Sequence, residues 1–132
     1  MTITVTLTDQ DKATLRTAAY GAVSLISATG AAHKASVAGS IALTSATGLV
    51  GHVLAAKARD IKLTVKNVAQ LADQVLPALT AAVGLLQQQD PNEAESFRTT
   101  VLVAVDAALH SGKGGPATIE MARKITAALD AA

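Results

Sequence analysis

His52 is the first of three places in this sequence whose residue types could do chemistry. It is the only ionisable side chain between Ala35 and Ala56, and an imidazole can bind a metal or transfer a proton. No histidine or carboxylate lies three or four residues away, so a second ligand would have to come from elsewhere in the fold. A neutral histidine hydrogen-bonded to a backbone carbonyl, or one that emerges near a helix end, explains His52 without chemistry. The sequence favours this simpler interpretation.

Asp106 and His110 are spaced four residues apart, so that their side chains can meet on one face of a helix. An aspartate that orients an imidazole is one arrangement used for general base catalysis. His110, however, falls at the end of its predicted helix, where the helix dipole favours a positive side chain. Capping of that helix therefore explains the pair without a catalytic role.

The loop from Ser111 to Gly115 reads SGKGG and comes just before a predicted helix, a place where backbone amides can bind phosphate. The nucleotide-binding P-loop needs the pattern GxxxxGK followed by Ser or Thr, after a strand. Here a helix precedes the loop and a glycine follows Lys113. The pattern therefore predicts a turn between two helices and no nucleotide site.

The composition excludes several further classes of function. The chain has no cysteine, which removes thiolate catalysis, cysteine-ligated metals and disulfides. Its net charge is +1 and only 2% of its residues are aromatic, so it offers neither the field nor the stacking platforms for nucleic acid. The small basic cluster of Arg59, Lys62 and Lys66 is typical of a solvated face. We therefore assign no catalytic residue, no metal ligand and no cofactor, and no nucleic acid partner.

The most informative segment for the fold is the stretch from 35 to 56, which contains no Lys, Arg, Asp or Glu. A helix without a polar face must be wrapped by other elements or by lipid. We predict that it forms one helix over 36–56, the most buried in the fold. Gly39, Gly48 and Gly51 lie inside this helix, and close approach by neighbouring helices would compensate for their low helix propensity.

Five helices are predicted in all, packed as a single-domain bundle in a mainly α fold around the small-residue helix 36–56. Capping patterns at Thr8, Asn67 and Asp90 mark three of the helix starts, and Pro91 and Pro116 occupy the first positions of the last two helices. The apolar stripes of the helices step by three and four residues. The buried face predicted for the fourth helix consists of Ala94, Phe97, Val101, Ala104, Val105 and Ala108. Ile119 is expected on the inner stripe of the last helix, and Glu120 is expected to pair with Lys124 on its outside. The predicted ranges are 9–29, 36–56, 67–88, 91–110 and 117–130.

Two short segments alternate apolar and polar residues in the manner of strands, and a minor two-stranded element over 2–7 and 60–66 would pair them. The second segment also fits the seam of a long helix, so the sequence leaves strand and helix open there. Ile3, Val5 and Leu7 share one face of the first strand. A two-stranded sheet is marginal alone and leaves an open edge, so we expect these residues to lie at a contact between two copies.

The leading functional hypothesis is a non-enzymatic cytoplasmic protein that acts through self-association as a homodimer, or through protein binding. One alternative is a small membrane-associated protein in which 35–56 spans the bilayer, although its many Ser, Thr and Gly residues and His52 disfavour this. Another is a ligand-binding or enzymatic bundle with a pocket near His52 and Tyr20. No pattern in the sequence selects a substrate.

Overall fold

The computed structural model describes residues 7–45, 48–55, 67–111 and 115–132. Within these ranges the chain forms six α-helices and one π-helical turn, and it contains no strand. The fold is therefore mainly α, as predicted. The elements are α1 (Asp9–Ile26), η1 (Ser27–Ala31), α2 (Ala32–Thr44), α3 (Gly48–Ala55), α4 (Val68–Gln89), α5 (Pro91–Ser111) and α6 (Pro116–Asp130).

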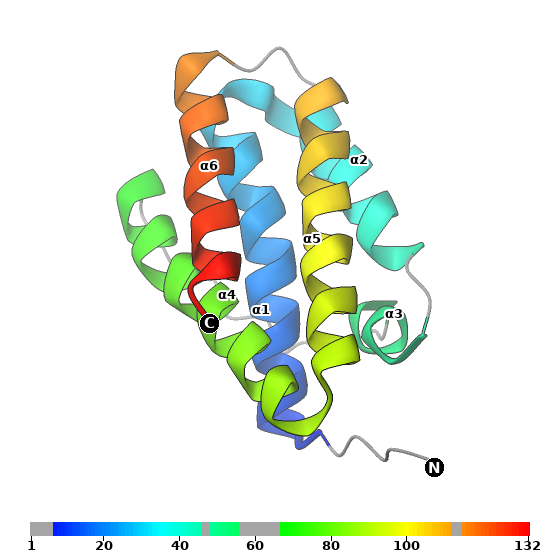
Figure 1. The fold of residues 1–132 in the computed structure, drawn as a ribbon. Helices are drawn as coiled ribbons and strands as arrows, with labels where there is room; N and C mark the ends of the chain where they lie inside the picture. Colours follow the sequence, from blue (N-terminus) through cyan, green and yellow to red (C-terminus); the bar gives the residue numbers. More distant parts are fainter. Residues whose placement is uncertain (1–6, 46–47, 56–66, 112–114) are drawn as a thin grey trace.

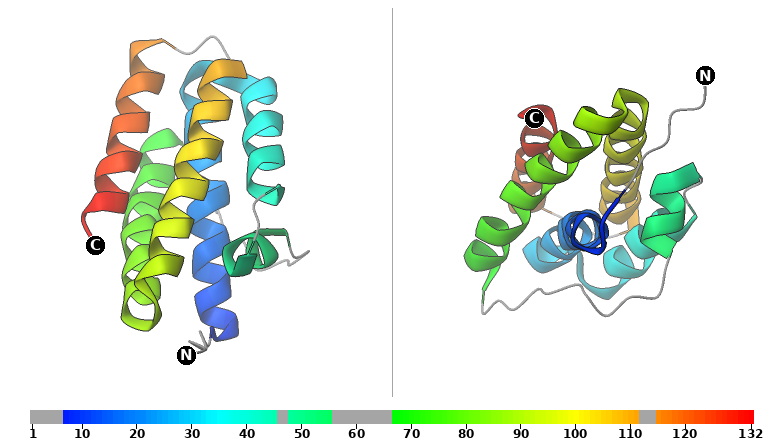
Figure 2. Two further views of the ribbon diagram at one scale, coloured as in Figure 1. Left: turned by 45° about the vertical axis from the view of Figure 1, so that its right-hand side comes forward. Right: turned by 90° about the horizontal axis from the view of Figure 1, so that it is seen from below.

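The helix α1 runs through the middle of the bundle. The helices α5 and α6 lie on one side of it, with α4 and α2 at its flanks (Figures 1 and 2). It contacts every other helix. Four of its buried residues are small (Ala18, Ala19, Gly21 and Ala22), and the other buried residues are Leu15, Arg16, Val23, Leu25 and Ile26. The prediction that 36–56 is the central helix is therefore wrong, because α1 occupies that place.

The segment 36–56 is not one helix. The helix α2 ends at Thr44, and α3 begins at Gly48 with a φ of 77°. Only glycine adopts this left-handed conformation without a steric cost, so the residue predicted to lie inside a helix instead starts a new one. Among the described residues, none has an atom within 4 Å of the position that a Gly48 Cβ would occupy, so the described part of the structure does not show the expected close packing there. A single spanning helix over 35–56 is therefore not formed.

Gly21 and Gly39 each allow two helices to pack closely where they cross. A Cβ on Gly21 of α1 would lie 2.5 Å from Val75 Cγ2 on α4, and one on Gly39 of α2 would lie 2.7 Å from Val23 Cγ1 on α1. These distances are far below van der Waals contact, so the backbones approach as closely as they do only because both positions lack a side chain. The role predicted for Gly39 is confirmed.

The starts of α1, α4 and α5 agree with the sequence patterns. The Thr8 hydroxyl accepts from the Asp11 amide, and the Asp11 carboxylate accepts from the Thr8 amide, which completes a capping box. Asn67 caps α4 through a 2.9 Å bond from the Gln70 amide, and Asp90 precedes Pro91 at the start of α5. The predicted inner face of α5 is also confirmed, since its residues are all buried: Ala94, Phe97, Val101, Ala104, Val105 and Ala108.

The first predicted helix ends earlier than expected. The helix α1 stops at Ile26, and the π-helical turn η1 leads directly into α2, where the sequence predicted a connection over 30–35. The predicted strands over 2–7 and 60–66 lie outside the described residues except for Leu7, which is in neither a helix nor a strand. Leu7 is half-buried and packs against the core.

Candidate interaction surface

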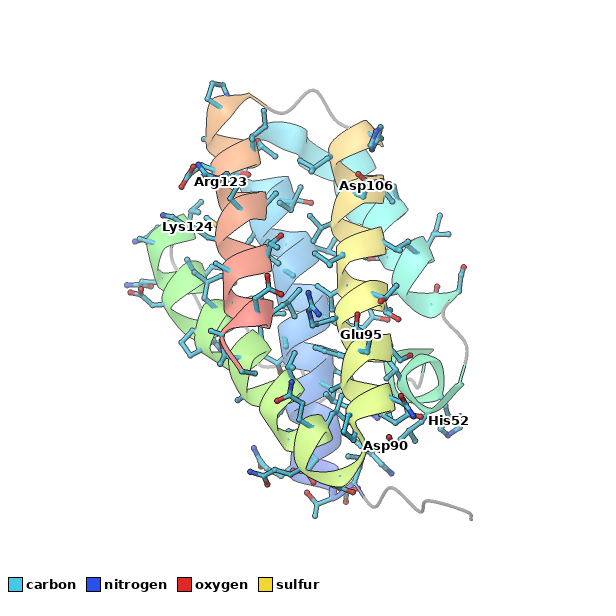
Figure 3. All side chains as sticks on the ribbon, in the orientation of Figure 1. His52, Asp90, Glu95, Asp106, Arg123 and Lys124 are labelled. Carbon is cyan, nitrogen blue, oxygen red and sulfur yellow. The ribbon has the colours of Figure 1, made fainter. Side chains whose placement is uncertain are left out.

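The residues predicted to form a pocket, His52 and Tyr20, have different surroundings. His52 is exposed on the outside of α3 (Figure 3). Tyr20 is half-buried on α1, and its hydroxyl donates to the Leu54 carbonyl at 2.7 Å. Burial raises the pKa of Tyr20, and the nearby Arg16 charge opposes this rise. The hydrogen bond from the Tyr20 hydroxyl joins α1 to α3. Neither His52 nor Tyr20 lines either of the surface hollows described below.

Arg16 is a second tie between these helices, one that the sequence analysis missed. Its side chain is 7% exposed, and its Nε donates to the Val53 carbonyl at 2.9 Å. The last carbonyls of a helix lack partners within the helix and carry partial negative charge, so a cation there is favourable. The sequence signal available for Arg16 was its position. It is the last charged residue before a run of forty residues in which Lys34 is the only Lys, Arg, Asp or Glu.

Asp106 and His110 do meet, as their spacing allowed. His110 Nδ1 lies 2.8 Å from the Asp106 carbonyl and 3.3 Å from the Asp106 carboxylate. Both side chains are at least 70% exposed, so water competes with the pair and no wall encloses a substrate beside it. The geometry is that of a cap at the end of α5. Within the described ranges, no group of three or more His, Asp or Glu residues could hold a metal ion.

A hollow of about 480 Å³ lies between α1 and α4. Its walls carry hydroxyl and amide groups, and Asp9 is the one formally charged residue that lines it. The lining residues are Asp9, Gln10, Ala13, Thr14, Thr17, Gln74 and Ala78. This set offers hydrogen bonds but no base positioned next to a nucleophile.

A second hollow, of about 470 Å³, lies where α6 faces α5, and we call it the α5–α6 groove. Its walls are largely apolar, with charges at the rim. The lining residues are Leu109 from α5 and Ile119, Ala122, Arg123, Thr126, Ala127 and Asp130 from α6. Figure 1 shows these two helices side by side on the outside of the bundle.

Ile119 is the unusual residue in this groove. It is 58% exposed, although the sequence pattern placed it on the inner stripe of α6. The inward position belongs instead to Thr118, which is fully buried and donates its hydroxyl to the Thr29 carbonyl of η1 at 2.9 Å. Because successive residues differ by about 100° around a helix, this hydrogen bond leaves Ile119 facing outward.

Contacts at both ends hold α6 in place. Thr118 fixes the first turn, and near the last turn the Thr80 hydroxyl of α4 donates to the Ala128 carbonyl at 2.7 Å. Arg98 of α5 binds Asp130 at 2.6 Å and Glu95 at 2.9 Å, which closes the lower end of the groove. The groove is therefore formed before any partner arrives, which lowers the entropic cost of binding.

Two other large hydrophobic side chains are exposed in the described part of the chain, Ile41 at 59% and Val103 at 54%. Neither lines a hollow. Single exposed hydrophobic residues are normal on a protein surface. Ile119 differs because it lines a groove whose walls are largely apolar. On the outer side of α6, Glu120 pairs with Arg123 at 3.0 Å, where the sequence predicted Lys124.

The chain matches no family model, and no curated protein and no solved structure is significantly similar to it. Among the described helices, α4 is the one long and apolar enough to cross a membrane, judged by length and composition alone.

Proposed function

We propose that this chain is a non-enzymatic helical protein that acts by associating with a second copy of itself through the α5–α6 groove. The observation that carries the proposal is the outward position of Ile119 within a groove that α6 and Leu109 of α5 line. A closed two-fold dimer uses the same patch on both copies, so each groove would receive the Ile119 of the other.

The energy available from this residue is modest. Full burial of an isoleucine contributes roughly 1.5–3 kcal/mol, so covering the exposed 58% of Ile119 gives about 1–2 kcal/mol per copy. Association costs about 4–15 kcal/mol of lost freedom, so the rest of the groove must contribute. We therefore expect a reversible dimer with a dissociation constant in the micromolar range.

This interface differs from the one predicted at Ile3, Val5 and Leu7. Leu7 packs against the core of its own chain, and the other two residues lie outside the described part of the structure. A contact through them stays a prediction. Deletion of residues 1–6 separates the two interfaces: the groove predicts an unchanged dissociation constant, and the N-terminal contact predicts a weaker one.

Sedimentation velocity on Ile119→Asp tests the groove, with Val103→Asp as the matched control. Both substitutions put one charge at a hydrophobic position of similar exposure, 58% and 54%, and only Ile119 lines the groove. Between about 1 and 300 µM, the wild type and Val103→Asp should shift toward dimer together, while Ile119→Asp stays monomeric. Circular dichroism checks that both variants keep their helices.

Two results would overturn the proposal. One is a wild-type protein that remains monomeric across this concentration range. The other is an Ile119→Asp variant that dimerises as well as Val103→Asp does.

A further inference from the structure

The first turn of α6 buries a hydroxyl and exposes the apolar residue next to it. Thr118 is fully buried, whereas Ile119 is 58% exposed. Burial favours an apolar side chain over a hydroxyl unless the hydroxyl has a hydrogen-bond partner. We infer that the bond from the Thr118 hydroxyl to the Thr29 carbonyl selects this rotation of α6 and thereby controls self-association. This inference rests on the proposed dimer and adds the residue that positions its central contact.

The sequence of α6 offers two inner faces that share the second half of the helix. The observed buried face is Thr118, Met121, Ile125 and Leu129. The face expected from the apolar stripe has the same last two residues and begins with Ile119 and Ala122. Because neighbouring residues differ by about 100° around a helix, a rotation smaller than this exchanges the two faces. The choice between them therefore depends on what holds the first half of α6.

The carbonyl that holds Thr118 belongs to the π-helical turn η1. The Thr29 hydroxyl donates to the Leu25 and Ile26 carbonyls at 3.1 and 3.0 Å, which joins the turn to the end of α1. The Thr29 carbonyl accepts from the Thr118 hydroxyl at 2.9 Å. Figure 1 shows the passage from α1 into α2 beside the first turn of α6, and η1 and α6 are in contact. The turn between α1 and α2 therefore sets how α6 faces the groove.

Removal of the Thr118 hydroxyl takes away the hydrogen bond that offsets the exposure of Ile119. The isoleucine then gains more from an inward place than an alanine at position 118 does, because its apolar surface is larger. The bond from Thr80 to the Ala128 carbonyl still holds the last turn, so α6 stays docked on the bundle. Ile119 therefore turns toward the core, and the α5–α6 groove loses the side chain that enters the other copy.

Thr118→Ala tests the inference, with Thr80→Ala as the matched control. Each substitution removes one threonine hydroxyl that joins α6 to another element, at 2.9 Å for Thr118 and 2.7 Å for Thr80. Neither threonine lines the groove. In sedimentation velocity, Thr118→Ala should raise the dissociation constant about tenfold, while Thr80→Ala and Thr118→Ser, which keeps the hydroxyl, stay within about threefold of the wild type. A role in stability alone predicts equal weakening by the two alanine substitutions.

Hydroxyl-radical footprinting read by mass spectrometry follows the rotation in the monomer, at about 1 µM, where dimerisation plays no part. In the wild type, Ile119 should be oxidised as readily as Ile41, which is 59% exposed, and Met121, which is 7% exposed, should be protected. In Thr118→Ala, oxidation of Ile119 should fall and that of Met121 should rise, because the alternative face turns Ile119 inward and Met121 outward. Local unfolding of α6 would raise the oxidation of both residues.

The outcomes separate this inference from the proposed function. If Ile119→Asp abolishes the dimer but Thr118→Ala and Thr80→Ala weaken it equally, the groove is the interface and Thr118 is not a positioning residue. If oxidation of Ile119 is unchanged or rises in Thr118→Ala, the inferred rotation is wrong. A wild type that is monomeric throughout overturns both the proposed function and its control by Thr118.

Discussion

The crossing of α1 and α4 at Gly21 provides a quantitative test of how this bundle is packed. A Cβ added at Gly21 would lie 2.5, 3.1 and 3.3 Å from three side-chain atoms of Val75. Val75 is fully buried, and a β-branched side chain has few alternative rotamers, so it cannot move aside cheaply. Gly21→Ala therefore overpacks the crossing, at a cost of about 1–3 kcal/mol.

Gly84 on α4 is the matched control. It also lies inside a helix, and no atom of the described residues that could clash is within 4 Å of the position that its Cβ would occupy. Both alanine substitutions gain about 1 kcal/mol of helix propensity, so this contribution cancels when the two variants are compared. Gly84→Ala should be more stable than the wild type. The free energy of unfolding of Gly21→Ala should be about 1–3 kcal/mol lower than that of Gly84→Ala.

Urea denaturation followed by circular dichroism measures both free energies of unfolding, provided that the slope with denaturant is the same for the variants. Equal stabilities of Gly21→Ala and Gly84→Ala would refute the account, because α1 and α4 would then not be in close contact at this point. The addition of Val75→Ala should rescue Gly21→Ala in part, since it removes the clashing atoms.

Three further predictions follow from single contacts. Gly48→Ala should lose about 1 kcal/mol of stability in denaturant unfolding despite open space around it, because φ is 77°; stability equal to the wild type would contradict the left-handed start of α3. Arg16→Met should cost about 1.5–3 kcal/mol by removing the donor to the Val53 carbonyl, whereas Lys12→Met on the same helix should cost much less; equal losses would exclude the tie to α3. Tyr20 is the only tyrosine, so the ultraviolet titration of tyrosinate reports it alone and should give a midpoint above 10.0. Because its pKa is raised in the folded state, the wild type should lose stability as the pH rises above about 10, and Tyr20→Phe should lose less over the same range.

Local signals in the sequence predicted well the features that depend on a few neighbouring residues. Capping at Thr8 and Asn67 depends on bonds to the residue three places on, and both are present. The buried face of α5 follows from a single apolar stripe and was predicted in full. Features of this kind can be predicted from the sequence, because the groups that interact are close together in the chain.

Features that depend on distant contacts were not predictable in the same way. The rotation of α6 that exposes Ile119 depends on a hydrogen bond from Thr118 to Thr29, 89 residues away. The division of 36–56 into two helices depends on the positive φ of Gly48. The sequence did not predict this break, because a glycine inside an apolar run is equally consistent with a close-packing site inside one helix. The hydrogen bond from Thr118 to Thr29 also leaves Ile119 exposed in the α5–α6 groove. The sequence pattern therefore predicted an inward position for the residue that the structure places on the outside.

The molar mass of the unmodified protein tests the central claim most directly. The chain has a mass of 13.3 kDa, so light scattering at about 200 µM should give a weight-average mass approaching twice that value, and dilution to about 1 µM should return it to 13.3 kDa. A mass of 13.3 kDa at both concentrations would contradict self-association through the α5–α6 groove.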